Sequence, residues 1–506
     1  MNVTGVKIMG DIVETIHPGD RISNLPDFIV HHIRSYLSAK EVARTSILSK
    51  RWNYLRASFP ILDFLESYPY FVGPRLATLN PSRRQEKKFR RRIYNFMKFV
   101  DDSLRRFCNL KLSMQKFRLL IGYVNVGYYF QFLDVWIGFA VKNEVKELDF
   151  DVQTDIETMY TLLPVIYSAK RVTNLKLCGC KLKLPSDTMR LHSLRILTLI
   201  ININVSPYIF ERIEIRVPSL QLLTLASTTL RGPIVIDGCP NLNILQLFGI
   251  TLTDVEFHRL ISKHPLLDTL NVIGCECLES VTISSNRLKK LSVGGCSNLK
   301  AVDVDTPKLL YFSFMDNPIP VSSMNAPCLR KVELAKDDPD TRWFLAVKEL
   351  LGVSNHIEDL TLQFMSKSIS FNVDEFRNSS ALVPCEVGTL CLHKMEPPLT
   401  MAAFLDCIFG ICYPTTLSIE AWNANDKFFI LWLHKEMVNR DVSCCDSHHI
   451  KCWRHHLNDF KIESFLKFED EKLLSRDDLM EVWPLLPMGT IRFHLEWCFS
   501  VPLENI

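Results

Sequence analysis

The segment CCDSHHIKCWRHH, residues 444–456, places seven cysteines and histidines within thirteen positions. Thiolates and imidazoles are the side chains that hold zinc, and four of them in a tetrahedron make a structural site. If the segment were one helix, Cys444, His448 and Cys452 would share a face. Cys444 and Cys452 would then lie about 12 Å apart along the helix axis. That separation is too large for one zinc ion.

A looped arrangement of the same segment leaves a zinc site open. Its ligands would come from Cys444 or Cys445, His448 or His449, Cys452, and His455 or His456. The segment lacks the C-x-x-C pair common in structural zinc sites, however. The other interpretation is a loop and then a strand, with side chains alternating between two faces from Trp453 to Leu457, that caps the C-terminal end of the fold. We favour this interpretation and expect neither metal nor cofactor.

The whole chain has the composition of a globular protein with balanced charge. Its 506 residues are 47% hydrophobic and include 25 Pro and 18 Gly, which argues against wholesale disorder. With 59 basic and 56 acidic residues, we expect no nucleic-acid partner. No phosphate loop, G-x-S-x-G or H-E-x-x-H motif indicates an enzyme.

Three features of the sequence indicate the cellular compartment of the protein. No apolar run reaches the roughly 18 residues of a membrane span, and the N-terminus has no signal-peptide pattern. The 16 cysteines show no disulfide-framework spacing, which favours reduced thiols. We therefore expect an intracellular protein of the nucleus and/or cytoplasm, neither secreted nor bound to a membrane.

From about residue 145 the sequence repeats the pattern L-x-x-L-x-L-x-x-[N/C]. The clearest copies are VTNLKLCGC (172–180), LRILTLIIN (194–202), LDTLNVIGC (267–275), LKKLSVGGC (288–296) and LLYFSFMDN (309–317). The spacing of roughly 20–30 residues is that of leucine-rich repeats. In x-L-x-L both leucines point to one face of a short strand, and stacked repeats bury them against each other. We expect parallel strands on a concave face, with helices and loops on the convex face.

Two sets of positions in the repeats follow from this pattern. The ninth position needs a small side chain in the turn, and it is occupied by Cys180, Asn202, Thr228, Cys275, Cys296 and Asn317. We interpret these cysteines as structural. The outward position between the last two leucines should line the concave face and contact a target protein. It is occupied by Lys176, Thr198, Thr224, Gln246, Asn271, Ser292, Ser313, Glu333 and Thr361.

A different pattern precedes the repeats, DRISNLPDFIVHHIRSYLSAKEVARTSILSKRWNYL at residues 20–55. It predicts three short helices, the first starting near Pro26. The LPD opening and the later A-x-x-S-x-L-S-K-R-W resemble an F-box, and with the repeats the chain resembles the plant F-box/LRR proteins with FBD-like C-terminal regions. In that family the F-box binds a Skp-type adaptor. By position, the adaptor-binding residues would be Leu25, Pro26, Ile29, Ile33, Leu37, Ala43, Ser46, Leu48, Ser49 and Trp52.

The resemblance implies a non-catalytic subunit of an SCF-type (Skp–cullin–F-box) ubiquitin ligase. The adaptor would link the chain to a cullin–RING enzyme, and the concave face would bind the target protein. One alternative is an interaction scaffold outside any ligase, with a vestigial F-box. A zinc-binding protein built on residues 444–456 is another.

The resulting organisation is α/β, with a short F-box of three helices followed by a curved repeat solenoid. The boundaries we expect are a flexible N-terminus at 1–19, the F-box at 20–60, a linker at 61–109, the repeats at 110–430 and an FBD-like cap at 431–506. Within the linker, Ile93, Met97, Val100, Leu104 and Phe107 have the spacing of an amphipathic helix. The basic run before them is a solvated face, a nuclear-import signal or a nucleic-acid patch.

Overall fold

The structure is a computed structural model of the full chain. It describes residues 25–37, 39–45, 47–65, 83–109, 113–121, 130–152, 160–161, 164–181, 191–201, 213–227, 234–315, 319, 321–354, 356–364, 372, 375–376, 384–393, 401–421, 424–440, 452–466, 472–474 and 489–498. The chain forms two compact units, Met1–Leu175 and Lys176–Ile506. Each is described by itself.

The first unit begins with the three predicted helices, α1 (Asp27–Ser35), α2 (Ala39–Thr45) and α3 (Lys50–Ala57). Helix α3 starts at Ser49, whose hydroxyl accepts a hydrogen bond from the Trp52 amide and so satisfies one of the unpaired N–H groups of the first turn. Val30, Trp52 and Leu55 form the small core between the helices.

The buried stripe of α1 includes a charged residue that the sequence pattern did not indicate. Arg34 is fully buried, with its guanidinium over the Trp52 ring, and donates hydrogen bonds to the Trp52 carbonyl and the Thr45 hydroxyl. Burial of a cation is tolerable only with such partners. Because Val30 and Arg34 point inward, Ile33 is left on the surface.

The rest of the first unit is a parallel sheet covered by helices. Strands β1 (Ile61–Leu65), β2 (Lys116–Ile121) and β3 (Glu147–Val152) pair in that order. The remaining elements are α4 (Arg83–Asn109), α5 (Phe130–Lys142), β4 (Tyr160–Thr161) and the 3₁₀ helix η3 (Pro164–Ser168). The helix predicted in the linker is confirmed as α4. Its stripe of Ile93, Met97, Val100, Leu104 and Phe107 is buried. Strand β1 lies in the segment assigned to the linker, so the sheet starts before the first repeat that the sequence reveals.

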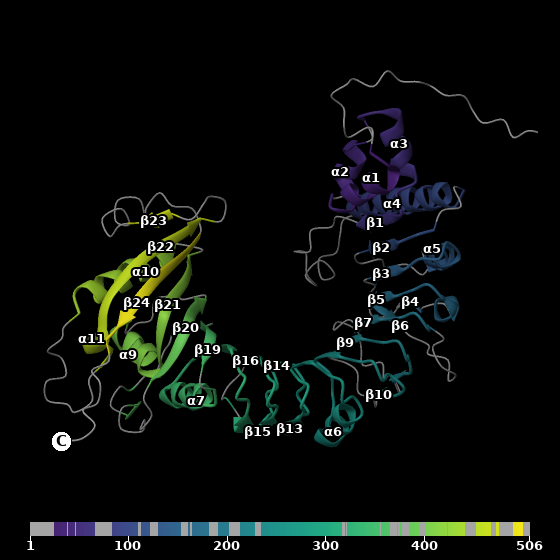
Figure 1. Ribbon diagram of the computed structural model, residues 1–506. Helices are drawn as coiled ribbons and strands as arrows, with labels where there is room; N and C mark the ends of the chain where they lie inside the picture. The colour runs from purple at the N-terminus through teal and green to yellow at the C-terminus, as the bar shows by residue number, and fades with distance from the viewer. Residues whose placement is uncertain are drawn as a thin grey trace, which may run out of the picture. The chain divides into compact units, whose positions relative to one another are not determined.

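The second unit consists of stacked repeat strands, visible in order in Figure 1. They are β5 (Asn174–Cys178, which starts in the first unit), β7 (Ile196–Ile201), β9 (Leu222–Ser227), β11 (Ile244–Phe248), β12 (Thr269–Ile273), β14 (Lys290–Gly294), β16 (Tyr311–Met315), β18 (Lys331–Lys336) and β19 (Ile357–Phe364). The two-residue strand β6 (Cys180–Lys181) is not part of this sheet. From β7 onward consecutive main strands pair in parallel without a register shift. Each copy of L-x-x-L-x-L therefore supplies one strand and two buried leucine-type side chains, as predicted.

Shorter elements return the chain between the main strands. These are β8 (Ile213–Ile215), β10 (Ile234–Ile236), β13 (Ser280–Ser284), β15 (Ala301–Asp305), β17 (Val321–Asn325) and the helices α6 (Asp254–Ser262) and α7 (Thr341–Leu351). Strands β8 and β10 pair with each other, and β13, β15 and β17 make a separate parallel sheet. The helical spacing of residues 255–264 and 341–352 predicts both helices. Helix α6 starts with a capping box between Thr253 and Glu256, and the Asp340 carboxylate caps α7.

The C-terminal part widens the sheet and changes its direction. Strands β20 (Cys385–His393) and β21 (Cys412–Ala421) continue the parallel order, with α9 (Met401–Ile411) and α10 (Ala424–Val438) packed beside β21. Strand β24 (Gly489–Trp497) then pairs antiparallel with β21, and β22 (Leu457–Leu466) pairs antiparallel with β24. The short β23 (Lys472–Leu474) pairs with β22.

One sequence prediction in this region is wrong. Residues Trp453–His456 form a short helix, α11, and the strand starts only at Leu457. Tertiary contacts explain the difference, because the Trp453 indole and the Arg454 guanidinium both donate to the Asp406 carboxylate on α9. The segment SRDDLMEVWPLL, residues 475–486, also predicts a helix, and it lies outside the described residues.

No helix among the described segments is both long and apolar enough to cross a membrane.

Candidate functional site

The F-box-like helices display apolar side chains on their surface. Leu48 is 64% exposed and Ile33 is 41% exposed, and Pro26 is also on the surface. Leu25, Ile29, Leu37 and Ser49 are half-buried. Of the remaining predicted adaptor-binding residues, Trp52 belongs to the core with 4% exposure. The side chain of Ala43, like the whole of Ser46, lies outside what the structure describes.

Several exposed apolar residues of these helices and the turns that follow them were not predicted from the sequence. They are Phe28, Tyr36, Ile47 and Tyr54, and Ile47 is 85% exposed. Together with Leu48 they give a module of three short helices an unusual number of large apolar side chains in water. Apolar residues outside the stripe that fills the helical core were the available signal.

The outward residues of the repeats form one continuous row across the second unit. The register pairs Thr198 with Thr224, then each next residue in turn: Gln246, Asn271, Ser292, Ser313, Glu333 and Thr361. The row continues through Cys391, Ser418 and Arg492, which the sequence did not reveal. All the predicted members, Lys176 of β5 included, are partly accessible except Ser313, which is buried.

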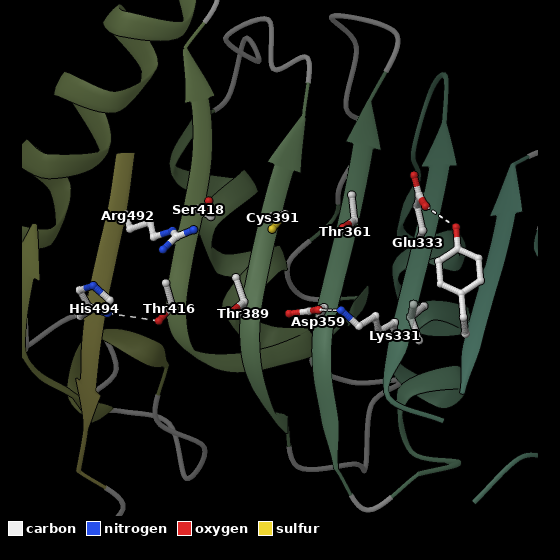
Figure 2. A pocket seen from close by; sticks show the side chains of 12 residues that line it. Lys331, Glu333, Asp359, Thr361, Thr389, Cys391, Thr416, Ser418, Arg492 and His494 are labelled. Carbon is white, nitrogen blue, oxygen red and sulfur yellow. Dashed lines mark hydrogen bonds and ion pairs between the residues drawn. The ribbon is translucent and has the colours of Figure 1, made fainter. Parts of the chain in front are cut away.

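A second row runs parallel to the first, two residues earlier along each of the parallel strands. It contains Tyr311, Lys331, Asp359, Thr389, Thr416 and His494. The two rows line a groove of about 440 Å³ that spans the sheet from β16 to β24 (Figure 2). We call it the terminal groove. Its volume lies within the range of small-ligand pockets.

One end of the terminal groove is organised by two polar contacts. The Tyr311 hydroxyl donates to Glu333 over 2.5 Å, and the Lys331 ammonium contacts Asp359 over 2.5 Å (Figure 2). Partial burial and the neighbouring Glu333 carboxylate raise the pKa of Tyr311 to about 12. The phenol is therefore neutral at physiological pH and cannot balance the Glu333 charge.

The other end lies on β24, where Arg492 and His494 project into the groove (Figure 2). The His494 ring contacts the Thr416 hydroxyl through Nδ1 over 3.2 Å and Glu463 through Nε2 over 2.8 Å. Between the two ends, β20 and β21 contribute only uncharged groups: Thr389, Cys391, Thr416 and Ser418. Burial raises the pKa of the Cys391 thiol, so this side chain is also neutral.

The cysteines at the ninth repeat position are packed inside the turns. Cys180, Cys275 and Cys296 are at most 5% exposed, which agrees with their interpretation as structural. Asn202, Thr228 and Asn317 lie outside the described residues. Within the described ranges, no group of three or more Cys, His, Asp and Glu side chains is placed to hold a metal ion. Residues 444–449, which the looped zinc arrangement requires, are not among those ranges.

Comparison with known proteins agrees with this division. Residues 22–55 match the F-box domain family, and residues 213–376 match the LRR domain family described as At1g61320/AtMIF1. Among curated proteins of Arabidopsis thaliana, the F-box protein At3g59000 is 27% identical over 68% of this chain and 59% of its own length. The F-box/LRR-repeat protein At3g58900 is 27% identical over 59% of this chain and 73% of its own. The putative F-box/LRR-repeat protein At3g58880 is 30% identical over 63% and 54%.

The alignment thus spans 59% of the length of At3g59000, the first of these relatives. Helices α1, α2 and most of α3 lie within the first matched domain, and the repeat strands from β9 to β19 lie within the second. The chain carries an F-box domain followed by a leucine-rich-repeat domain, the combination named in the F-box/LRR-repeat proteins that it resembles.

Proposed function

We propose that the chain is the target-recognition subunit of an SCF-type ubiquitin ligase. The F-box would bind a Skp-type adaptor, the adaptor would connect to a cullin–RING enzyme, and the polar row would bind the target. The single observation that carries this proposal is the set of exposed apolar side chains on the F-box helices and the turns between them, which includes Ile47 and Leu48. Water-exposed patches of this kind mark sites of protein association.

The predicted adaptor residues would then have different roles. Ile33 and Leu48 would contact the adaptor directly because their side chains are accessible. Trp52 would hold the helices in place from the core. Leu25 would both contact the adaptor and hold the helices in place. Its side chain packs against that core, and its carbonyl accepts a hydrogen bond from Arg51. Substitution of Leu25 would therefore loosen the module as well as change its surface.

Catalytic side chains are not required for this function. A ligase subunit that holds the target near the transfer enzyme acts through proximity, and the chemistry belongs to other subunits. The proposal fits a polar groove that contains hydroxyl groups and paired charges.

The test is binding of a purified Skp-type adaptor to the full chain. The double variant Ile47→Asp, Leu48→Asp should lower the affinity about a hundredfold or more, because burying each side chain contributes about 1.5–3 kcal/mol. Val255→Asp is the matched control. It also replaces an exposed apolar residue, but on α6 in the other unit. Thermal unfolding should be unchanged in both variants, since all three side chains already lie in water.

Equal affinity of the two variants, or no binding by the unmodified chain, would contradict the proposal. Addition of cullin to the adaptor complex separates the ligase from the alternative of a scaffold outside any ligase. A complex that captures adaptor but never incorporates cullin would favour the scaffold.

A further inference from the structure

The sheet face that carries the polar row is uncharged over strands β7, β9, β11 and β12. The polar row crosses the middle of these strands from Thr198 to Asn271, and one more outward residue lies on either side of it in each strand. None of these outward residues is charged, although charged residues make up 23% of the chain. The outward residues of the next four main strands include Lys290, Lys331, Glu333 and Asp359.

Apolar side chains flank the polar row on both sides. Two residues earlier along the strands lie Ile196, Leu222 and Ile244, and two residues later lie Ile200, Ala226, Phe248 and Ile273. All of them are half-buried and so reach solvent. The first apolar row ends at β12, where the Thr269 hydroxyl donates to the Asp268 carboxylate over 3.1 Å. We call the two apolar rows, together with the polar row from Thr198 to Asn271 between them, the uncharged patch.

The polar row within the uncharged patch has hydrogen-bonding groups to offer. The Thr224 hydroxyl donates to the amide oxygen of Gln246 over 2.9 Å, which orients this amide. Among the described residues, the NH₂ group of Gln246 and the side chains of Thr198 and Asn271 have no hydrogen-bond partner. These groups are therefore available to the backbone of a bound peptide.

The dimensions of the uncharged patch fit an extended peptide of about four residues. The apolar rows are four residues apart along each strand, about 13 Å, and three steps from β7 to β12 cover about 14 Å. Four residues of an extended chain span about 13 Å and send successive side chains to opposite sides. A segment that follows the polar row would place its side chains alternately on the two apolar rows. The N–H and C=O groups of every second residue would then face the polar row.

A helix or a charged segment does not fit the uncharged patch in this way. The N–H and C=O groups of a helix bond within the helix, so it would remove water from Thr198, Gln246 and Asn271 without replacing the hydrogen bonds. A charged side chain would also lose water, and the outward residues of the patch offer no opposite charge to pair with it. The surface therefore complements a segment that is both extended and uncharged.

We infer that the uncharged patch binds an extended run of about four uncharged, apolar residues in the target protein. The inference rests on the proposed function and specifies the target class for it. Runs of this kind are buried inside folded domains, where neighbouring strands bond their backbone groups. The target would therefore present the run in a segment that is not packed into a folded domain.

The experiment is titration of three fluorescent peptides with the purified full chain, followed by anisotropy. The first peptide has the core Val-Leu-Val-Leu between Gly-Ser flanks, the second has Val-Ser-Val-Ser, and the third has Val-Lys-Val-Glu. The second lacks the side chains for one apolar row and should bind at least about tenfold more weakly than the first. The third should also bind at least about tenfold more weakly, because its charges lose water without a partner.

Phe248→Lys tests the place of binding. It adds a charge to one apolar row and should weaken binding of the first peptide at least about tenfold. The aliphatic stem of lysine can pack beside the neighbouring side chains, so β11 should still form. If this variant fails to fold, Asn271→Lys takes its place with the same expected loss, since it adds the charge to the polar row and removes no apolar side chain.

Thr361→Lys is the matched control. Thr361 is also half-buried and belongs to the same polar row, but it lies on β19 in the terminal groove, outside the uncharged patch. This variant should bind the first peptide as tightly as the unmodified chain does.

No binding of the first peptide, or equal binding of the first and second peptides, would overturn the inference. Unchanged binding in the folded patch variant, or an equal loss in Thr361→Lys, would also overturn it. Adaptor binding measured on the same protein separates this failure from failure of the proposed function. Intact adaptor binding without discrimination among the peptides refutes only the patch inference, whereas absence of adaptor binding refutes the ligase proposal.

Discussion

Gly388 in β20 lies so close to β19 that a methyl group in its place would overlap the neighbouring backbone. A Cβ atom built on Gly388 would lie 2.6 Å from the Glu358 carbonyl oxygen and 3.4 Å from its carbonyl carbon. Strands β19 and β20 cannot easily separate to make room for a methyl group. On its other side β20 is paired along its length with β21, and the Thr415 hydroxyl donates to the Gly388 carbonyl.

We therefore expect Gly388→Ala to destabilise this part of the sheet. Overpacking costs about 1–3 kcal/mol, and the smaller conformational freedom of alanine in the unfolded chain returns about 0.4–1 kcal/mol. The middle of these two ranges gives a net loss of about 1.3 kcal/mol, which corresponds to a factor of about 9 in the opening equilibrium. Hydrogen exchange of peptides covering β19 and β20 measures it, as faster exchange of those amides by this factor.

Gly138→Ala is the control with the opposite sign. Gly138 lies in α5, and a Cβ atom there would meet nothing within 4 Å. Alanine should stabilise the helix by about 0.5–1 kcal/mol. Unchanged exchange of β19 and β20 in Gly388→Ala would refute the close approach of the two strands.

Two further predictions concern ionisable side chains. A hydrogen bond to the Cys296 thiol and burial raise the pKa of Cys275. Maleimide at pH 7.5 should therefore label the exposed Cys277 and Cys328 and leave Cys275 unmodified, as measured by mass spectrometry of the labelled peptides. Equal labelling of the three cysteines would contradict the packing of Cys275 inside its turn. Since the pKa of Tyr311 is raised to about 12 against 10 in the unfolded chain, its contribution to stability should be complete below pH 10 and lost as pH rises through 12. The difference in ultraviolet titration between the unmodified chain and Tyr311→Phe should show one phenol ionising near pH 12, and ionisation near pH 10 would contradict the bond to Glu333.

The repeat strands could be predicted from the sequence because each is encoded locally. The two leucines of every x-L-x-L point to one face, so the residue between them must be on the other, and Gln246, Asn271 and Ser292 lie in one row as expected. Helix α4 could also be predicted from the sequence, because the residues of its buried stripe recur at intervals of three and four.

The terminal groove could not be predicted because long-range pairing builds it. TIRFHLEW is recognisable as a strand, but nothing in those letters says that it pairs antiparallel with β21 and thus adds Arg492 and His494 to the row. The helical turn at Trp453 has a similar origin, in an aspartate 47 residues earlier in the chain. On α1, the four-residue spacing of Ile29 and Ile33 indicates a helix from the sequence alone. The burial of Arg34 cannot be read in the same way, because it depends on partners from α2 and α3.

The central claim is that the F-box helices, and not the repeats, bind the adaptor. Hydrogen exchange of the full chain with and without a purified Skp-type adaptor tests it most directly. We predict slower exchange in the adaptor complex for peptides within residues 25–37 and 47–57, with no change in β16, β18, β19, β20 or β21. Protection confined to those repeat strands, or no protection within residues 25–57, would contradict it.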